Sequence, residues 1–571
     1  MDGLRAGHQC ERRCRPLHRV VPRLLRSLSV RLDARSTLAC YLLLLVVYIG
    51  GAMVPLMNND SAHHAGIALH MHVSGDWLRL ITQGHDYLDK PHLLFWLAAL
   101  SFKVFGVSTF AYKLPSLLFS VLAVYSTARL GRLLHSAEVG RLAGLILASA
   151  IAFILANNDV RMDALLTGSI MFAIWQLAEF VAGGRWRNLV LAGLGLALGF
   201  ATKGMIGVAM PGIAVFLHLL YRRDWARLFD PRWLALPLIV LVFAAPVLFA
   251  YYQQFGADGV RFILWSQNFE RLAGERFGNA GAEDPLFFVH TFLWAFLPWS
   301  FLTLVALWSQ GLRVLRGGLR PQPGEEMLTL GTIVVLFAII SASQFKLPHY
   351  LNILLPLFSI VLATWLAPRI ARPATRGVWV VQFLAILVLA LLAVAINGWA
   401  FPPLGWGVMA GAVGLLVAGA VLSLSRSGGA RVVLASVAAA VVFNFLLAWN
   451  FYPQLLRYQA GTVLGEAVER LALDPASVYY LEEQGRAGSF DFTTARLTPT
   501  LTLAQLQAMS VPVVLYTSAS GREAVEAAGL RAEVLASNPD FRVTRLNARF
   551  LNPAKRPDTL SEVFLLRVVA Q

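Results

Sequence analysis

Charged residues are scarce in this chain of 571 residues, because Asp, Glu, Lys and Arg together make up only 14% of it. Soluble domains carry roughly 25% charged residues, so the composition argues against an ordinary soluble globular protein. Hydrophobic residues make up 57% of the chain, and the mean hydropathy is +0.63. These values predict a protein that crosses a membrane many times.

Cysteine is also rare, and its three residues, Cys10, Cys14 and Cys40, all lie near the N-terminus. The C-terminal part therefore has no disulfide framework. Cys10 and Cys14 have the spacing of half a zinc site, but no second pair of ligands accompanies them. We therefore predict no structural zinc.

Basic residues are in excess, with a formal net charge of +16. Nucleic-acid binding is one reading of such a charge, but the arginines are grouped in short clusters between apolar segments, as the positive-inside rule expects. The distribution therefore predicts membrane topology and no nucleic-acid partner. Residues 1–36 are rich in arginine and are predicted to form a cytoplasmic tail that rests on anionic lipid.

Long apolar segments dominate the rest of the sequence. About 20 apolar residues are needed for a helix to span a bilayer. The predicted spans are 37–57, 112–134, 139–156, 162–182, 188–202, 204–221, 233–252, 286–310, 327–343, 349–367, 377–396, 402–424 and 430–450. Segment 91–106 is the ambiguous case, because it is short, follows Lys90-Pro91 and contains Lys103.

The charge bias decides how segment 91–106 is placed. If it does not cross, the cytoplasmic side receives the basic connections Arg132–Arg141, Arg185–Arg187, Arg222–Arg232, Arg313–Arg320, Arg369–Arg376 and Arg426–Arg431. If it crosses, all of them move to the outside, against the rule. We therefore predict about thirteen crossings, with 91–106 lying along or dipping into the outer face.

Three units follow from this topology: the basic tail 1–36, a transmembrane catalytic domain 37–450 with outer loops 58–111 and 253–285, and an external α/β domain 451–571. In the last unit, Gly461–Leu473 is predicted to be a helix. The predicted strands are Ser477–Leu481, Val511–Thr517, Phe541–Asn547 and Glu562–Val569. This domain has no glycine-rich phosphate loop and no evident acid/base pair, which indicates a role in stability or partner contact.

Charged residues that the topology does not explain gather on the outer face. They are Asp60, Asp89, Lys90, Asp159, Arg161, Asp163, Lys203, Glu270, Arg271, Arg276 and Lys346, with Tyr350 beside them. Ionisable groups at membrane depth are costly and are functional or paired by default. Carboxylates among Lys, Arg and Tyr suit a site that holds an anionic phosphate leaving group while a carboxylate accepts a proton.

Simpler readings remain for several of these residues. Lys203 and Lys346 stand at span ends, where lysines also extend toward lipid headgroups. Asp163 has the position of a helix cap or of a partner for Arg161. The histidines of 63–85 include a pair, His63 and His70, that a helix places on one face, but no carboxylate has ligand spacing beside them.

A series of short motifs in the sequence resembles those of a known family. The motifs are Asp60, Ala65-x-Ile67-Ala68, Ser74-Gly75-Asp76-Trp77, Asp89-Lys90-Pro91-x-Leu93-Leu94-x-Trp96, Phe105-Gly106-Val107, Leu114-Pro115-Ser116, Asp163-Ala164-Leu165-Leu166, Thr202-Lys203-Gly204, Leu297-Pro298-Trp299 and Lys346-Leu347-Pro348-x-Tyr350. In this order they are similar to the bacterial lipid A aminoarabinose transferases and the dolichyl-phosphate-mannose protein mannosyltransferases of the GT-C superfamily. The resemblance covers about residues 40–370.

The resemblance implies a GT-C fold and an inverting transfer of a sugar from a polyprenyl phosphate to lipid A or another envelope acceptor. It implies a bacterial inner-membrane location, no cofactor, and at most a weak link to a divalent metal. Asp60 and Asp163 match the family's catalytic carboxylates. Lys90, Arg271 and Tyr350 match the groups that meet the lipid phosphate, with Lys203 and Lys346 as further candidates. Ser61, Asp89 and His92 depart from the family pattern and leave the substrate open.

Three other functions fit parts of the pattern. A protein O-mannosyltransferase would share the fold and differ in its acceptor. A lipid flippase or transporter tends to show internal repeats and polar residues near the midplane, whereas this sequence has no evident repeat and places its charges toward one surface. A non-catalytic assembly subunit is the third alternative.

Overall fold

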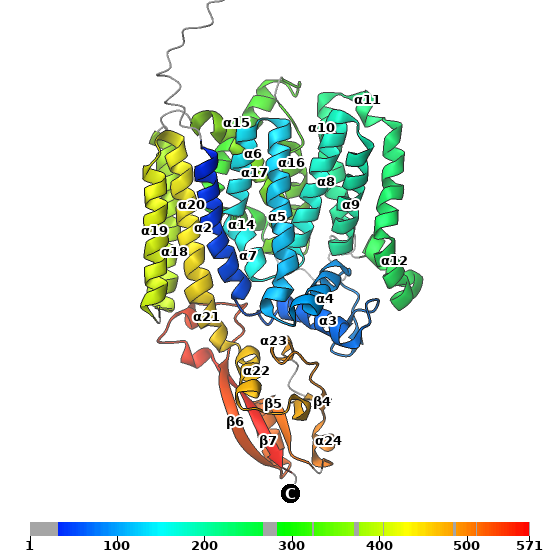
Figure 1. Cartoon of the computed structure of the whole chain (residues 1–571), viewed down its shortest axis with the longest axis vertical. Helices are drawn as coiled ribbons and strands as arrows, with labels where there is room; N and C mark the ends of the chain where they lie inside the picture. Colours follow the sequence, from blue (N-terminus) through cyan, green and yellow to red (C-terminus); the bar gives the residue numbers. More distant parts are fainter. Residues whose placement is uncertain are drawn as a thin grey trace, which may run out of the picture.

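The computed structural model describes residues 32–266, 283–322, 325–370, 376–403, 405–482, 487–509 and 511–569. Long helices run side by side in a bundle, with two shorter helices across one end and a small domain with a β-sheet beyond them (Figure 1). The helix α2 (Ala34–Met53) begins at the opposite end of the bundle from the sheet. We call the end that carries the two short helices the site end.

The bundle consists of helices whose bounds follow the apolar segments of the sequence. After α2 they are α5 (Thr109–Leu134), α6 (Ala137–Ala148), α7 (Ile151–Asn158), α8 (Asp163–Gly183), α9 (Trp186–Lys203), α10 (Ile206–Arg222), α11 (Trp225–Leu228), η1 (Pro231–Leu234), α12 (Ala235–Arg261), η2 (Phe262–Ser266), α14 (Phe287–Ala295), α15 (Ser300–Arg316), α16 (Leu330–Ala342), η3 (Pro348–Leu354), α17 (Leu355–Ile370), α18 (Arg376–Val394), η4 (Ala395–Ala400), α19 (Trp406–Leu424), α20 (Gly428–Leu446) and η5 (Leu447–Phe451).

The chain is a multi-pass membrane protein. Within the described residues, eight helices are long and apolar enough to cross a membrane, or up to ten if the bent pairs α6–α7 (52°) and α14–α15 (120°) each count as one span. The most apolar windows of α18 and α19 are only 17% buried inside the protein, which leaves most of their apolar surface for lipid. Each of the thirteen predicted segments falls on a helix or bent pair of the bundle.

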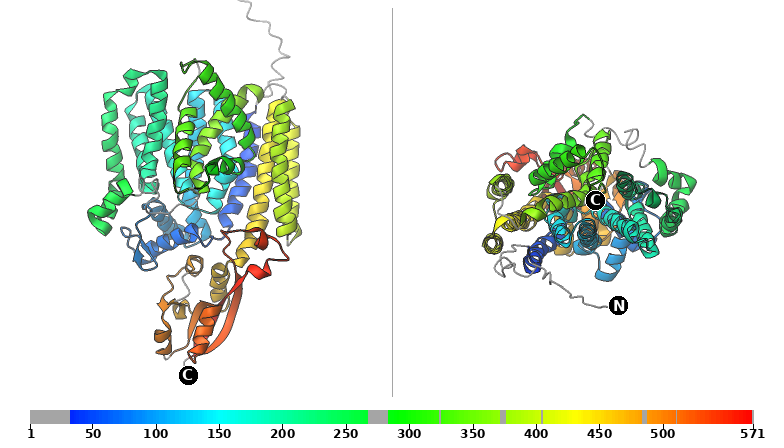
Figure 2. Two further views of the ribbon diagram at one scale, coloured as in Figure 1. Left: turned by 180° about the vertical axis from the view of Figure 1, so that it is seen from behind. Right: turned by 90° about the horizontal axis from the view of Figure 1, so that it is seen from above.

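The ambiguous segment 91–106 forms α4 (Leu93–Phe105), which has 13 residues. At 1.5 Å per residue it extends about 20 Å and is too short to span the hydrocarbon. It packs against α3 (Asp60–Ser74) and α5, and both short helices lie across the site end (Figures 1 and 2). The structure therefore agrees with the placement that the charge bias predicts.

The predicted outer loops are partly regular structure. Residues 58–111 contain α3, α4 and the short strands β1 (Ile81–Thr82) and β2 (His85–Asp86). The prediction of a loop from 253 is wrong for its first part, because helical structure continues to Ser266 through a bend at Gly256, where φ is 63°. Before the bend, Gln254 accepts a hydrogen bond from the Leu80 amide and donates one to its carbonyl, both at 2.9 Å.

A five-stranded sheet forms the centre of the C-terminal domain, in the order β4–β3–β5–β7–β6. Its strands are β3 (Val478–Leu481), β4 (Thr500–Leu501), β5 (Val513–Ser518), β6 (Arg531–Asp540) and β7 (Ser561–Val569), and its helical segments are α22 (Ala460–Arg470), η7 (Pro475–Ser477), α23 (Gly488–Thr493), α24 (Leu503–Gln507), α25 (Ala519–Ala527), α26 (Ala548–Leu551) and η9 (Pro557–Thr559). The segments α21 (Tyr452–Leu455) and η6 (Leu456–Tyr458) connect it to the bundle. The β3–β4 and β3–β5 pairs are parallel, and β7 is antiparallel to both β5 and β6.

The predicted strand Phe541–Asn547 is wrong. The strand is β6, which ends at Asp540 and pairs with β7 along its length. After it, the Phe541 ring stacks on Phe550 with centroids 3.8 Å apart, and Asn547 caps α26 by accepting the Phe550 amide at 2.9 Å. As an edge strand, β6 is half exposed and tolerates Pro539, so it lacks the apolar run that marks a central strand.

Glycines bring α9 and α10 into contact. A Cβ added to Gly207 would lie 2.2 Å from the carbonyl carbon of Gly199, whereas a Cβ at Gly212, one and a half turns further along α10, would meet no atom within 4 Å. Backbone-to-backbone contact of this kind is typical of small residues in membrane helices. The close approach keeps the C-terminal end of α9, and with it Lys203, against its neighbours.

We predict that Gly207→Ala destabilises the protein by roughly 1–3 kcal/mol, because the added methyl group must force two backbones apart. Thermal unfolding of the purified protein in detergent measures the effect. Gly212→Ala is the matched control on the same helix and is expected to leave the midpoint unchanged or slightly higher. Equal midpoints for the two variants would contradict the packing described here.

Candidate active site

Asp60 begins α3 at the site end. Asn59 caps this helix by accepting the Ser61 amide at 2.7 Å, which fixes where the helix starts. The Asp60 side chain is 59% exposed and lies 3.2 Å from the Arg161 guanidinium. It is therefore held in place by an ion pair and remains open to a substrate.

Arg161 lies in the turn between α7 and α8 and joins two carboxylates. Besides Asp60, it donates to the same oxygen of Asp159 from Nε at 3.2 Å and Nη2 at 3.0 Å. Asn59 donates to that oxygen as well, at 3.0 Å. Burial lowers the pKa of Arg161, but Asp159 and Asp60 more than offset it, so its pKa is raised and it stays charged.

Asp163, the first residue of α8, is buried, with 6% of its side chain exposed. Lys203, the last residue of α9, lies 3.4 Å from its carboxylate. The Lys203 ammonium also lies over the Tyr350 ring, 4.7 Å from the centroid, and His349 and Arg161 both interact electrostatically with Asp163. Asp163, Lys203 and Tyr350 therefore meet, as the prediction of one site requires.

Lys90 precedes α4 and lies 2.6 Å from Asp89. His63 and His64 of α3 interact electrostatically with Asp60, Asp89 and Lys90. Burial lowers the pKa of both histidines, that of His64 to about 3. Both imidazoles are therefore neutral at physiological pH.

Lys346, another predicted site residue, forms its hydrogen bond with a different segment. Lys346 donates to the carbonyl of Asp284 at 2.9 Å, in the segment before α14. Arg271 lies outside the described residues, as do Glu270 and Arg276. We use "paired cluster" below for Asp60, Asp159, Arg161, Asp163, Lys203 and Tyr350.

Sequence reasoning missed two contributors. Asn59, which caps the start of α3, donates a hydrogen bond to Asp159, which follows the end of α7. His349 lies in η3 and interacts electrostatically with Asp163. Each is the chain neighbour of a predicted residue, Asp60 and Tyr350 respectively, and that adjacency was the available signal. Neither carries a pattern of its own, because their roles depend on segments distant in the chain.

Metal ligands do not cluster in the part of the chain that the structure describes: no group of three or more His, Cys, Asp or Glu side chains has the geometry to hold an ion. His63 and His64 contact Tyr87 rather than a carboxylate.

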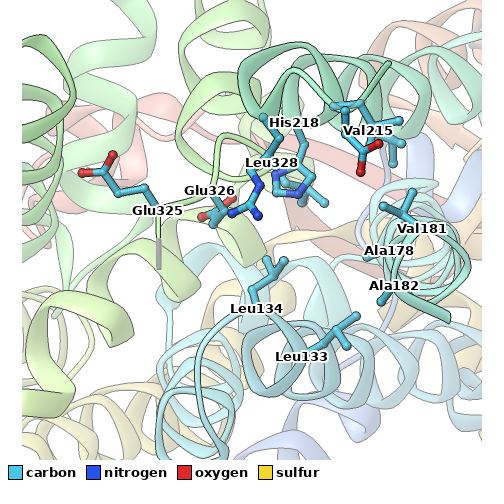
Figure 3. A pocket seen from close by; sticks show the side chains of 13 residues that line it. Leu133, Leu134, Ala178, Val181, Ala182, Val215, His218, Glu325, Glu326 and Leu328 are labelled. Atoms are coloured by element: carbon cyan, nitrogen blue, oxygen red, sulfur yellow. The ribbon is translucent and has the colours of Figure 1, made fainter. Parts of the chain in front are cut away.

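A cavity of about 260 Å³ lies at the other end of the bundle, lined by Leu133, Leu134, Ala178, Val181, Ala182, Val215, His218, Leu219, Arg222, Asp224, Glu325, Glu326 and Leu328 (Figure 3). Ala182 and Asp163 are at opposite ends of α8, which places them nearly 30 Å apart at 1.5 Å per residue. This cavity is therefore separate from the paired cluster.

Known proteins resemble this chain in both sequence and structure. The family described as dolichyl-phosphate-mannose-protein mannosyltransferase matches residues 89–249. ArnT from Cupriavidus metallidurans, solved bound to undecaprenyl phosphate, superposes with a TM-score of 0.72 at 18% sequence identity, over 92% of this chain and 97% of that one. The chain has the ArnT fold. This is the predicted GT-C architecture.

Curated relatives also match this chain in sequence. The undecaprenyl phosphate-alpha-4-amino-4-deoxy-L-arabinose arabinosyl transferase of Pseudomonas paraeruginosa is 31% identical over 373 residues, which is 62% of this chain and 64% of that protein. The same-named protein of Edwardsiella ictaluri is 29% identical over 336 residues, 56% of this chain and 58% of its own length. The predicted resemblance is confirmed, and the matches span less than two thirds of these relatives.

We predict that the Asp163–Lys203 pair is coupled. Lys203→Met leaves a buried carboxylate short of its nearest cation and is expected to cost about 3 kcal/mol. Because Asp163→Asn removes that carboxylate, the double variant should cost less than the sum of the two single variants by about 1 kcal/mol or more. Unfolding by SDS titration of the four proteins measures the coupling, and strict additivity would contradict the contact.

We predict that His64 makes the protein less stable in acid. Its folded pKa is about 3 and its usual value is 6.5, so below about pH 6.5 the unfolded chain takes up the proton and stability falls at up to about 1.4 kcal/mol per pH unit. His64→Asn should flatten the decline of the melting temperature between pH 7 and pH 5. The exposed His85 provides the control, His85→Asn, which should leave the slope as in the unchanged protein.

Proposed function

We propose that this protein is an inverting glycosyltransferase that moves a sugar from a polyprenyl-phosphate donor to lipid A or another envelope glycolipid. The observation that carries the proposal is the paired cluster at the site end of an ArnT fold. Three carboxylates and two cations from distant segments meet there. The names of the relatives, which transfer an aminoarabinose from undecaprenyl phosphate, support the donor class.

The donor brings its own activation. A sugar joined to a phosphate through its anomeric carbon already has a leaving group, so the protein needs to stabilise negative charge on the departing lipid phosphate. Lys90 is our first candidate for this task, because only 12% of its side chain is exposed and its partner Asp89 is the preceding residue. Arg271, Lys346, Lys203 and Tyr350 are proposed as further contacts to the phosphate.

Asp60 is the group we assign to the acceptor. Its exposed carboxylate can take the proton of an acceptor hydroxyl, or can orient an acceptor that is already a phosphate. Arg161 holds one of its oxygens at 3.2 Å, which fixes the direction of the carboxylate. Asp163 is buried against Lys203 and is proposed to set the position of that ammonium near the reacting phosphate. A single displacement inverts the anomeric carbon.

The charge distribution supports one orientation of the protein in the membrane. We propose that the protein lies in a bacterial inner membrane with its basic connections in the cytoplasm and the site end in the periplasm. The basic tail 1–36 is then cytoplasmic, 37–450 is the catalytic membrane domain, and 451–571 is periplasmic. In Figure 1 the α10–α11 connection, within the basic stretch Arg222–Arg232, lies at the end opposite the sheet, as this arrangement requires.

We predict that Asp60→Asn lowers the turnover number by 10²–10³-fold, as loss of a group that positions or activates the acceptor does. Lys90→Met should instead raise the donor KM by about 10- to 100-fold, because a hydrogen bond to a charged group is lost. The assay follows release of polyprenyl phosphate from undecaprenyl-phosphate aminoarabinose in proteoliposomes that contain lipid A. Asp86→Asn, at an exposed site on the same outer segment, is the control.

Mass spectrometry of the acceptors separates the competing functions. Sugar found on protein in place of lipid A would identify an O-mannosyltransferase-like enzyme, an alternative that the match to residues 89–249 favours. Movement of labelled donor across the membrane without any glycosylated product would contradict the proposal and indicate a flippase. Full turnover in both Asp60→Asn and Lys90→Met would remove the assigned site.

A further inference from the structure

Lys113 is a fully buried lysine that the proposed chemistry does not use. It lies in the second turn of α5, and its exposed fraction is 0%. Its ammonium donates three hydrogen bonds, to the carbonyls of Val54 at 2.6 Å, Asn158 at 2.7 Å and Gly51 at 3.0 Å. Within the described residues, no carboxylate lies at ion-pair distance from it.

The three acceptors belong to the ends of two helices. Gly51 and Val54 are in the last turn and cap of α2, and Asn158 is the last residue of α7. The last carbonyls of a helix have no partner within it and carry the negative end of the helix dipole. One ammonium therefore satisfies acceptors of both ends and attracts both dipoles.

The two helix ends are also packed directly on each other. A Cβ on Gly51 would lie 1.9 Å from the side-chain oxygen of Asn158, so a larger residue at position 51 would displace that side chain. Both ends lead within a few residues to the proposed site: α2 through residues 55–59 to Asp60, and α7 directly to Asp159 and the turn that holds Arg161. Lys113 thus contacts the two chain segments that lead to Asp60 and to Asp159.

We propose that Lys113 is a positioning residue that fixes the distance between the Asp60 helix and the Asp159–Arg161 turn. A buried cation without a carboxylate partner is costly, and an apolar residue would fill the same space without that cost. Lysine satisfies three carbonyls from two chain segments with one atom, and Arg161 can then span both carboxylates. The kinetic consequence of this inference rests on the proposed function. Its structural consequence rests on the contacts alone.

The test compares Lys113→Met, Lys113→Gln and the control Lys103→Met, which alters an exposed lysine of α4. Lys113→Met should lower the turnover number on the order of 100-fold, as a displacement of about 1 Å in a site does, while the donor KM changes by less than about threefold. Lys113→Gln keeps hydrogen-bond donors and should recover part of the turnover. Lys103→Met should behave as the unchanged protein.

Hydrogen exchange gives a readout that does not depend on activity. In Lys113→Met, faster exchange confined to peptides covering 52–62 and 156–163 supports positioning, whether or not the protein transfers sugar. Faster exchange throughout the bundle would assign Lys113 to general stability and overturn the proposal, as would unchanged exchange with turnover within about threefold of normal. If Lys113→Met shows the confined increase in exchange and the unchanged protein has no transferase activity, only the proposed function is refuted.

Discussion

The contact of Arg161 with Asp60 and Asp159 is the interaction on which the site end depends. Asp60 comes from the first short helix after α2, and Asp159 from the end of α7, about 100 residues later in the chain. A guanidinium presents several donors in a fixed fork, so one side chain holds both carboxylates in a defined relation. Without it, the two carboxylates would repel each other.

Other contacts support the same short stretch of chain from outside the bundle. Gln459, at the entrance to the C-terminal domain, accepts the Asn58 amide at 2.6 Å and donates to the Leu56 carbonyl at 2.8 Å. The link between α2 and Asp60 is thus held by the bundle on one side and by the domain linker on the other. This gives the C-terminal domain a structural connection to the site although it contributes no member of the paired cluster.

Most of the charges at the site end are already paired before any substrate arrives. Pairing lowers the cost of keeping Asp163 and Lys203 near the hydrocarbon, and the neutral imidazoles of His63 and His64 add no further charge. Lys90 is paired with Asp89 and Lys203 with Asp163, so an anion that binds either lysine must compete with its carboxylate.

The membrane architecture could be predicted from the sequence because lipid imposes a strong local rule: backbone groups must be satisfied within each apolar segment. All thirteen segments appear as helices, and the arginine clusters correctly keep α4 out of the bundle. Prediction failed where local pattern was weak, as at β6, whose exposed residues look like a loop, and at 253–266, where helical structure continues beyond a bend at Gly256.

The sequence by itself determined the spans, the side on which charges gather and the family resemblance, because periodicity, hydropathy and motif order are properties of neighbouring residues. Only the tertiary structure decided which charges meet. It paired Asp60 with Arg161 and Asp163 with Lys203, placed Lys346 against Asp284, and brought Lys113 under two helix ends. These contacts join segments 40 to 101 residues apart, and their geometry depends on how whole helices pack, which no local pattern encodes.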